Sequence, residues 1–548
     1  MCTITKVGDS IERRGGADIA RRLAGICGAR FARPAGAADG VAGAVARWVA
    51  APGTPEAVTE VVRLAAEHDL SVVARGAGTK LDWGTPPSQV DIVLDTGRLA
   101  GVWQQPDDEL VAEIGAGTPV RAAEAILERT GRRLPIDVPS VGATVGGVVA
   151  ANESGPLRHL HGRPCDQLVG VSYVDASGVL SHARVGTAGQ PGERSDAVPA
   201  DSDVARLTDA AVARLTDPAR LAGPDVVRLT DPARLADSDV ARLLCGSQGA
   251  LGVLVSATLR VQPIPASRAW VTRSVWTPLE VHDLVRAVLD AELRPTAIEV
   301  DLPGGRVSPA GRHLRAVGSG GHLPPDGPGA TGAPGPSGRA AARGWFEAPG
   351  ASAAGSVAAT SGAGDRTRYG RGRGVRGRLT EPGAGTLAIL LEGGPAEVAE
   401  RAAGLTRLLG GDARAVGVAP PWWRRYPFQP DEVALRIEVP IGDLHAAVYA
   451  LRDAAGMPVP VRGSAGLGVV HAALPGDSSP ERVGVILDGV RAVLRARSGR
   501  CVVVAAPARV REAVDLWGEL PDLPRLRRVK ERFDPARRLA PGRYPGGI

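Results

Sequence analysis

The sequence has few cysteines and no paired cysteine motif. Its five cysteines are spread along 548 residues, and no two of them form a CxxC pair. An odd and scattered set is not the pattern of a disulfide framework, and it lacks the clustered thiolates that an iron–sulfur cluster requires. We therefore expect neither feature in this chain, and no group of residues predicts a metal site.

Long hydrophobic runs are also missing. No stretch approaches the roughly 18 uncharged apolar residues that a membrane-spanning helix requires. The opening residues MCTITKVGDSIERRGG have no apolar run after their arginine pair, so they do not predict a secretory signal. We expect a soluble cytoplasmic protein without an integral membrane segment, which a partner could hold at the inner membrane.

A basic surface is missing from most of the chain. The net charge is +6, but residues 303–380 alone hold eleven arginines against three acidic residues, and the remainder is close to neutral. This distribution does not predict a nucleic-acid partner. The arginine–glycine run 371–378 keeps RNA binding open as a separate hypothesis, which predicts salt-sensitive retention of RNA.

The chain is too long for a single core, and its 72 glycines and 45 prolines indicate that part of it is not packed. Residues 201–243 repeat a short Asp-Val-Ala-Arg-Leu unit, most of which lies in an insertion assigned to 188–238. The repeat favours a local duplication inserted into a domain over a solenoid. Residues 303–385 are rich in glycine, proline and arginine and are predicted to be a disordered insertion.

Strands and helices alternate between these insertions. The first 46 residues show weak periodicity, so we assign them no chemistry and expect order to begin near Trp48. Strands are then predicted at 48–51, 70–74, 91–94 and 110–114, with helices opening at Thr54-Pro55 and at Thr118-Pro119. A second α+β unit is predicted from strands at 386–391, 433–439, 467–473 and 501–505 and helices at 395–408, 442–455 and 480–497.

Three glycine-rich segments carry the chemical information. Ala74 to Lys80 follows a buried strand, and its small residues would let successive backbone N–H groups approach an anion. A plain loop is the alternative, because neither G-x-G-x-x-G nor GK[ST] is present. Pro139 to Arg158 combines glycines with hydroxyls and ends in a polar cluster, and its alternative is a packing helix. Cys245 to Arg260 is a tight glycine turn running into an alternating strand.

In this order, the three segments resemble the flavin-binding domain shared by vanillyl-alcohol oxidase and p-cresol methylhydroxylase (PCMH), and most of all the FAD-binding subunits of bacterial glycolate oxidase. The resemblance covers residues 47–187, 239–265 and 386–548, where Phe533 to Arg543 is similar to the family's closing motif. It implies an α+β fold: a PCMH-type FAD-binding domain of two α/β subdomains, followed by an α+β cap. The implied domains are a variable segment at 1–46, the FAD domain at 47–265, and the cap at 266–302 and 386–548.

The resemblance also implies where FAD binds. Backbone amides of the first loop and residues of the second would cradle the diphosphate, and the polar cluster and Val253 would lie near the flavin. The residues so assigned are Arg75, Gly76, Ala77, Gly78, Thr79, Lys80, Ser140, Ala143, Thr144, Val145, Gly146, Gly147, Asn152, Ser154, Gly155, Arg158 and Val253. The first loop lacks the histidine that anchors covalent flavin in some relatives, so we expect noncovalent FAD.

The implied activity is the oxidation of a small 2-hydroxy acid, such as glycolate or D-lactate. Electrons would leave through a complex with an iron–sulfur subunit and a second flavoprotein subunit. Arg158, Arg436 or Arg462 could pair with the substrate carboxylate. His471 is the other catalytic candidate, although a lone histidine on a strand is more often a packed residue than a catalyst.

Two departures from the relatives leave an alternative open. Catalytic relatives carry H-x-G-D-G-N-x-H in the cap, whereas this chain reads GSAGLGVVH at 463–471. A stretch resembling G-G-x-V-V-K-N-V-A-G-Y-D is replaced by the insertion that follows Val185. The alternative is a noncatalytic structural or electron-relay subunit that retains the flavoprotein fold.

Overall fold

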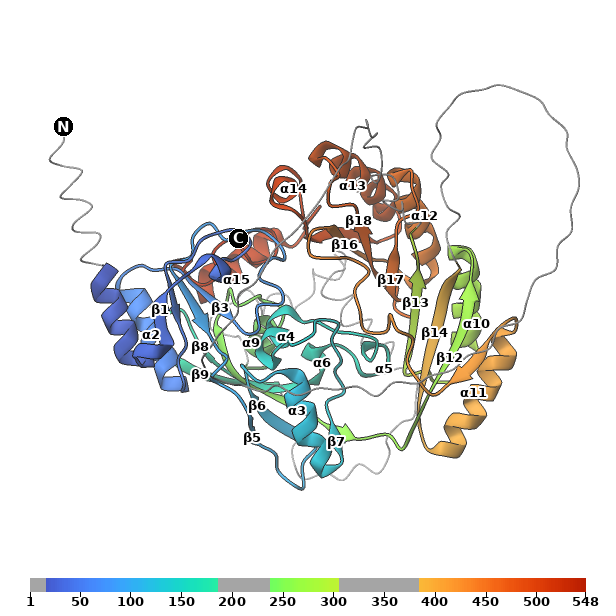
Figure 1. The fold of residues 1–548 in the computed structure, drawn as a ribbon, viewed down its shortest axis with the longest axis horizontal. Helices are drawn as coiled ribbons and strands as arrows, with labels where there is room; N and C mark the ends of the chain where they lie inside the picture. Colours follow the sequence, from blue (N-terminus) through green and yellow to red (C-terminus); the bar gives the residue numbers. More distant parts are fainter. Residues whose placement is uncertain (1–15, 186–236, 305–383) are drawn as a thin grey trace, which may run out of the picture. The chain divides into compact units, whose positions relative to one another are not determined.

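The computed structural model describes residues 16–185, 237–304 and 384–548. The predicted insertions at 188–238 and 303–385 lie almost entirely outside these described residues. Large hydrophobic clusters organise the described part into a first lobe, which contains two main sheets, and a cap built on one sheet (Figure 1).

The first sheet of the lobe has the strand order β1-β2-β4-β3. Its strands are β1 (Ala32–Pro34), β2 (Trp48–Ala50), β3 (Val72–Arg75) and β4 (Ile92–Asp95), of which β2, β3 and β4 run parallel. Helix α2 (Pro55–Glu67) connects β2 to β3, and the Thr54 hydroxyl caps it by accepting a hydrogen bond from the amide of Ala57. The predicted helix and strands are confirmed here.

Order begins before Trp48, so that prediction is wrong. A helix spans residues 16–27 and buries Ile19, Leu23 and Cys27, whose spacing of four places them on one helical face. Strand β1 then pairs antiparallel with β2 at the edge of the sheet. The four-residue apolar spacing was present in the sequence, but small and basic residues around it weakened the pattern.

The second sheet has the order β5-β6-β10-β8-β9, and all its pairs are antiparallel. Its strands are β5 (Val102–Gln104), β6 (Val111–Gly115), β8 (Leu168–Val174), β9 (Leu180–Arg184) and β10 (Val253–Arg260). Val253 and Val255 pack in one hydrophobic cluster and Leu254 and Leu259 in another. Both faces of β10 are therefore covered.

Short helices surround this second sheet. Helix α3 (Val120–Leu127) continues into a 3₁₀ turn, Glu128–Thr130, and the small strands β7 (Arg132–Arg133) and β11 (Gln262–Pro263) pair with each other. The remaining helices are α4 (Val145–Ala151), α5 (Arg158–His161), α6 (Pro164–Gln167) and α9 (Asp237–Leu244).

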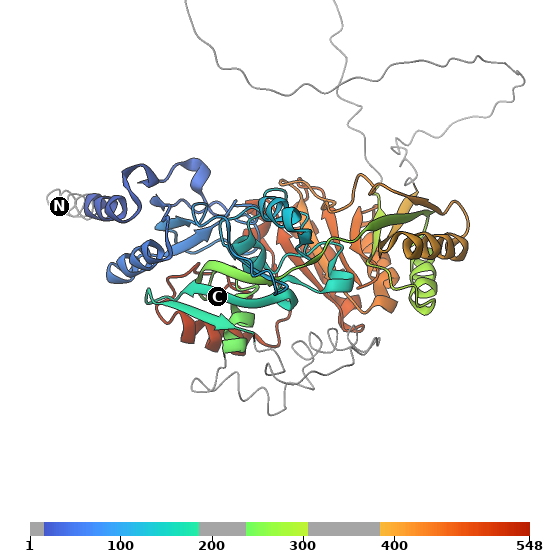
Figure 2. The same cartoon turned by 90° about the horizontal axis from the view of Figure 1, so that it is seen from below.

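The cap contains an antiparallel sheet of the order β15-β12-β14-β13-β17-β18-β16-β19. Its helices α10 (Pro278–Asp290), α11 (Pro395–Leu409), α12 (Leu444–Ala455) and α13 (Pro480–Arg495) pack in one hydrophobic cluster against the sheet (Figures 1 and 2). The strands are β12 (Ser267–Val275), β13 (Ala297–Leu302), β14 (Gly385–Gly393), β15 (Arg414–Val416), β16 (Val433–Glu438), β17 (Val461–Ser464), β18 (Val469–Leu474) and β19 (Arg500–Ala505).

The two faces of the cap sheet have opposite chemistry. Successive side chains along a strand point to opposite faces, so Ile298, Ile437 and Val470, which pack under the helices, define the apolar face. The neighbours of these residues along each strand, Glu299, Arg436 and His471, point to the other face. Ionisable side chains therefore gather on the face that the helices leave uncovered.

The last part of the chain returns to the first lobe after α14 (Ala508–Ala513). In α15 (Leu523–Phe533), the Lys530 ammonium donates hydrogen bonds to the carbonyls of Ala250, at 2.8 Å, and Leu539, at 2.7 Å. The Ala540 amide donates to the carbonyl of Val72 at 2.8 Å. The predicted cap boundary at 548 therefore differs from the structure, because these residues complete the core of the first lobe.

Candidate functional site

The first glycine loop, residues 76–80, begins where β3 ends. A Cβ atom on Gly76 would lie 2.1 Å from the Thr144 hydroxyl oxygen, and Gly78 has a φ of 77°, so both positions favour glycine. In the part of the chain that the structure describes, no acceptor takes a hydrogen bond from the amides of residues 76–80. These free N–H groups suit an anionic ligand.

The second loop and α4 pack directly against the first loop. The Thr144 hydroxyl accepts a hydrogen bond from the Gly147 amide at 3.3 Å and begins the helix. A Cβ atom on Gly146 would lie 2.6 Å from the Cβ of Ala116, so this helix sits tightly on the end of β6. Ala143 and Val145 are buried, whereas Gly142 has a φ of 81° and open space beside it. The predicted cradle residues are thus brought together around two adjoining backbone turns.

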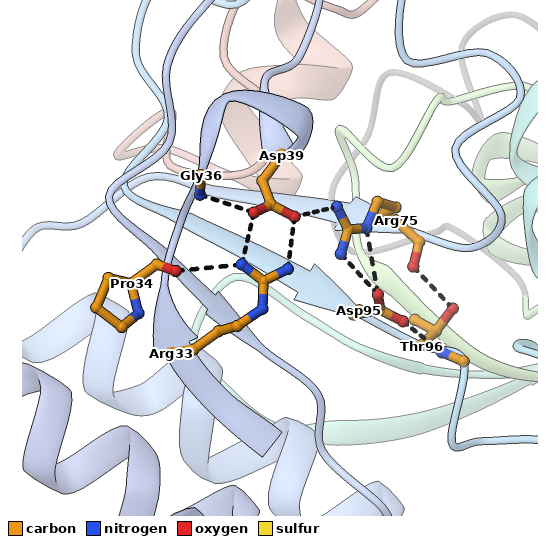
Figure 3. A network of polar contacts seen from close by, with 8 residues as sticks. Arg33, Pro34, Gly36, Asp39, Arg75, Asp95 and Thr96 are labelled. Atoms are coloured by element: carbon orange, nitrogen blue, oxygen red, sulfur yellow. Dashed lines mark hydrogen bonds and ion pairs between the residues drawn. The ribbon is translucent and has the colours of Figure 1, made fainter. Parts of the chain in front are cut away.

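The side chain of Arg75 belongs to an ionic network beside the loops (Figure 3). It contacts Asp39 at 2.9 Å and Asp95 at 2.8 Å, and Arg33 reaches the other oxygen of Asp39 at 2.6 Å. The guanidinium of Arg33 is the main cause that holds the pKa of Asp39 well below its usual value. Residues before Trp48, to which we had assigned no role, therefore anchor the strand that leads into the first loop.

Glu153 joins both loops to the cap. Its carboxylate lies 2.8 Å from the Lys80 ammonium, and it accepts hydrogen bonds from the hydroxyls of Ser140, at 2.7 Å, and Tyr426, at 2.8 Å. Lys80 also lies 3.7 Å from the centre of the Trp83 ring. Burial lowers the pKa of Lys80, and the charge of Glu153 opposes that shift. Sequence reasoning missed Glu153 and Tyr426 because nothing in their local patterns shows that they meet.

The polar residues after α4 have two different roles: Asn152 stabilises the local fold, whereas Ser154 and Gly155 line a cavity. Asn152 has a φ of 49° and ends the helix, and its side-chain Oδ1 accepts hydrogen bonds from the Cys165 amide and the Cys245 thiol. Ser154 and Gly155 line a cavity of about 50 Å³. Val253 is buried in β10 and does not line this cavity.

The cavity lies where the first lobe meets the uncovered face of the cap sheet. Residues of both the first lobe and the cap line it, among them Ser154, Gly155, Arg158, Glu299, Trp422, Tyr426, Arg462 and His471. The Tyr426 ring lies edge-on to the His471 ring, with 4.8 Å between centroids. The segment that follows β15 therefore covers the histidine, and three of the four predicted candidates, Arg158, Arg462 and His471, line one cavity.

The three candidate arginines have different partners. Arg462 is held by Asp301 at 2.8 Å and by the Tyr426 carbonyl at 3.0 Å, and Arg436 forms an ion pair with Glu438. The Arg158 guanidinium forms no ion pair or hydrogen bond with any residue that the structure describes. Burial lowers the pKa of Arg158 to about 10, so this guanidinium remains charged at neutral pH.

Burial also sets the protonation of the other ionisable groups. Desolvation, followed by the charges of Arg436, Lys80 and Arg158, holds the pKa of His471 well below its usual value. Although burial opposes the change, Arg436 and neighbouring arginines lower the pKa of Glu438 to about 2. At neutral pH the cavity thus contains an unprotonated imidazole beside a charged guanidinium.

Comparison with known proteins agrees with this geometry. Residues 46–184 match the family described as the FAD binding domain. The match places an FAD-binding domain in this part of the chain. The PCMH-type fold and FAD as the cofactor are thereby confirmed as predicted, and the free amides of the first loop fit the diphosphate of FAD.

Two curated relatives are similar to part of this chain. The chain is 26% identical over 245 residues to the glycolate oxidase subunit GlcE of Escherichia coli strain K12, covering 44% of this chain and 56% of that protein. It is 30% identical over 130 residues to a D-lactate dehydrogenase of Archaeoglobus fulgidus, covering 24% of this chain and 29% of that protein. The matches thus span about half or less of these relatives.

Structural similarity to a solved protein covers more of the chain than the sequence matches do. A solved alkyldihydroxyacetonephosphate synthase superposes with a TM-score of 0.58 at 14% identity, covering 96% of this chain and 84% of that protein. This likeness shows a shared fold and carries no information on substrate. Among the described helices, none is long and apolar enough to cross a membrane.

Proposed function

We propose that this protein is an FAD-dependent oxidoreductase that oxidises a small 2-hydroxy acid, such as glycolate or D-lactate. The observation that carries the proposal is the guanidinium of Arg158, which has no partner among the described residues, in a cavity that also contains His471. A guanidinium offers two parallel donors to a carboxylate. The names of the glycolate oxidase and D-lactate dehydrogenase relatives support this substrate class.

In this proposal Arg158 binds the carboxylate of the substrate and His471 contacts its hydroxyl group. Arg158 pairs with the carboxylate, because Arg436 and Arg462 already have carboxylate partners within the cap. A ring nitrogen of His471, unprotonated at neutral pH, accepts the proton of the substrate hydroxyl. The neighbouring positive charges disfavour an imidazolium, so His471 readily passes that proton on.

The loops and the cap provide binding. The amides of residues 76–80 hold the FAD diphosphate, with the remaining predicted contacts from the second loop and the Asn152–Arg158 segment, and binding is noncovalent. The chemistry that FAD supplies when bound is acceptance of the hydride from the substrate's hydroxyl-bearing carbon. Loss of that hydride and of the hydroxyl proton converts the 2-hydroxy acid to a 2-oxo acid. Trp422 and Tyr426 line the cavity on the side of the cap.

The protein acts in this proposal as one subunit of a complex. Relatives from Escherichia coli and Bacillus subtilis are named as subunits of glycolate oxidase. Electrons would pass to an iron–sulfur subunit, with a second flavoprotein subunit in the same assembly. Co-purification of the tagged chain from its native cells, followed by iron and flavin analysis, tests this part.

The central test is anaerobic reduction of the bound flavin. We expect glycolate or D-lactate to bleach the flavin absorbance of the FAD-loaded chain, and acid precipitation to release the flavin into the supernatant. Arg158→Met should raise the substrate concentration needed for reduction by at least about tenfold, the loss expected from one charge-assisted contact. Arg414→Met, an exposed change on β15, is the control. Bound FAD that no 2-hydroxy acid reduces would instead favour the noncatalytic subunit.

A further inference from the structure

Glu299 is a buried acid whose hydrogen bonding is incomplete. It lies on β13, lines the same cavity as Arg158, and is 6% exposed. Its Oε1 atom has no hydrogen-bond partner, and Glu299 forms no ion pair with a residue that the structure describes. An ionised carboxylate left in this condition would carry a large desolvation cost. The arrangement therefore favours a Glu299 carboxyl group that is protonated or that forms a hydrogen bond with a bound ligand.

The surroundings of Glu299 favour the protonated form. Burial, followed by the nearby carboxyl of Asp137, raises the pKa of Glu299 to about 8, although a hydrogen bond with Ser464 and the charge of Arg158 oppose the shift. Burial likewise raises the pKa of Asp137 to about 7. The other charged or titratable groups that line the cavity are Arg158, Arg424, Arg425, Tyr426, Arg462 and His471. A protonated carboxyl group carries one O–H donor, which no carboxylate can offer.

We propose that Glu299 is a substrate-binding residue whose protonated carboxyl group donates a hydrogen bond to a carboxylate oxygen of the bound hydroxy acid, beside the Arg158 guanidinium. This assignment rests on the proposed function for the class of ligand. Ionisation of Glu299 removes the donor and places a negative charge against an anionic ligand. The residue thus makes recognition of a monocarboxylate dependent on a single proton.

The experiment measures ligand binding and does not depend on turnover. Acetate and glycolate are titrated by calorimetry into the FAD-loaded full chain between pH 6.5 and pH 9.5. Because only the protonated form binds, affinity in the wild type should fall about tenfold from pH 7 to pH 9, across the pKa of about 8. Glu299→Gln keeps an N–H donor that cannot ionise, so its affinity should be nearly constant over that interval.

Glu124→Gln is the matched control. Glu124 is a half-buried acid on α3 whose pKa is also raised by burial, but it does not line the cavity. Glu124→Gln should retain the wild-type pH dependence. Because Asp137 is unchanged in both variants, its titration contributes equally to each profile.

Three outcomes separate the possibilities. A Glu299→Gln protein that loses affinity with pH as the wild type does would overturn the assignment. So would much tighter acetate binding by Glu299→Gln at pH 7, because it would show that Glu299 is ionised there. Acetate binding that depends on Glu299, without flavin reduction by any 2-hydroxy acid, would defeat the proposed function and leave the assignment standing.

A spectroscopic measurement covers the case in which the Glu299 variant does not fold. Infrared difference spectra of the wild type should show the carbonyl stretch of a protonated carboxylic acid shifting when acetate binds at pH 7. No such shift would contradict the proposal without any substitution.

Discussion

Two lysine–carboxylate pairs in this chain resemble each other in length and burial but differ in what surrounds them. The Lys530–Asp534 pair is 2.7 Å long with both side chains fully buried, and its remaining hydrogen bonds go to backbone groups such as the carbonyls of Ala250 and Leu539. The Lys80–Glu153 pair is 2.8 Å long, and its further partners are mainly side chains, those of Ser140 and Tyr426, with one backbone amide, that of Ser140. Burial alone does not distinguish an ion pair that stabilises the fold from one at the binding site. The other hydrogen-bond partners of each pair do distinguish them.

The sharpest way to test this contrast is to remove Lys530. Lys530→Met leaves Asp534 buried without its charge partner, so we expect a loss of about 3–5 kcal/mol in the free energy of unfolding, measured with urea. Arg495→Met removes an exposed pair with Glu519 and should cost at most about 1 kcal/mol. Equal losses in the two variants would refute the scaffold role of Lys530.

Removal of Lys80 should act on the cofactor as well as on stability. Lys80→Met leaves Glu153 with hydrogen bonds from Ser140 and Tyr426, so we expect a smaller loss of about 2–3 kcal/mol. Because Lys80 links the first loop to Ser140 of the second, the purified variant should retain less FAD, measured by absorbance per chain. The contrast breaks down if Lys530→Met at low temperature loses FAD to the same extent.

The Asp39 network extends the comparison to a partly exposed cluster. The pKa of Asp39 is depressed in the folded state from a reference value of 3.8, so its contribution is present above that value and disappears as pH falls. Asp39→Asn should therefore lower the free energy of unfolding by about 1–2 kcal/mol at pH 7, since hydrogen bonds between charged groups are lost. The difference from the wild type should shrink below about pH 4 in urea titrations at each pH. A difference that is constant with pH would contradict the ionic role.

The smallest expected effect comes from the Tyr426 hydroxyl. Tyr426→Phe removes one hydrogen bond to Glu153 but keeps the ring stacked on Phe428, at 4.9 Å between centroids. We expect a loss of about 0.5–1.5 kcal/mol in unfolding free energy. Tyr449→Phe, on the exposed face of α12, is the control and should leave stability unchanged. A change equal to that of Lys80→Met would mean that the Tyr426 hydroxyl contributes as much to the network as Lys80 does.

Local chemistry in the sequence predicted much of the fold. Thr54-Pro55 predicted the start of α2, and the observed helix begins at Pro55. The glycines at 76, 78, 142 and 146 lie where close packing or a positive φ requires them. These features can be predicted from the sequence because their causes lie within a few neighbouring residues.

The rest depends on pairings between distant segments. Strand β10 inserts between β6 and β8, although more than 75 residues separate it from either along the chain. The alternation in β13 predicts that Glu299 faces away from the core, but not that the first lobe covers that face. That no described residue pairs with Arg158, and that Glu153 meets Tyr426, could not be inferred from local patterns for the same reason.

The return of the chain to the first lobe bears on the order of events during synthesis. The ribosome releases the residues of β3 and the first loop long before Arg538, Ala540 and Arg543. Yet the backbone of Val72 pairs with Arg538 and Ala540, and the Arg543 guanidinium donates to the carbonyls of Lys80, Leu81 and Trp83. The first lobe therefore cannot complete its core until the cap has been translated. A fragment ending at residue 265 would lack residues 538–543 and would leave the surface that they cover exposed to chaperones and proteases.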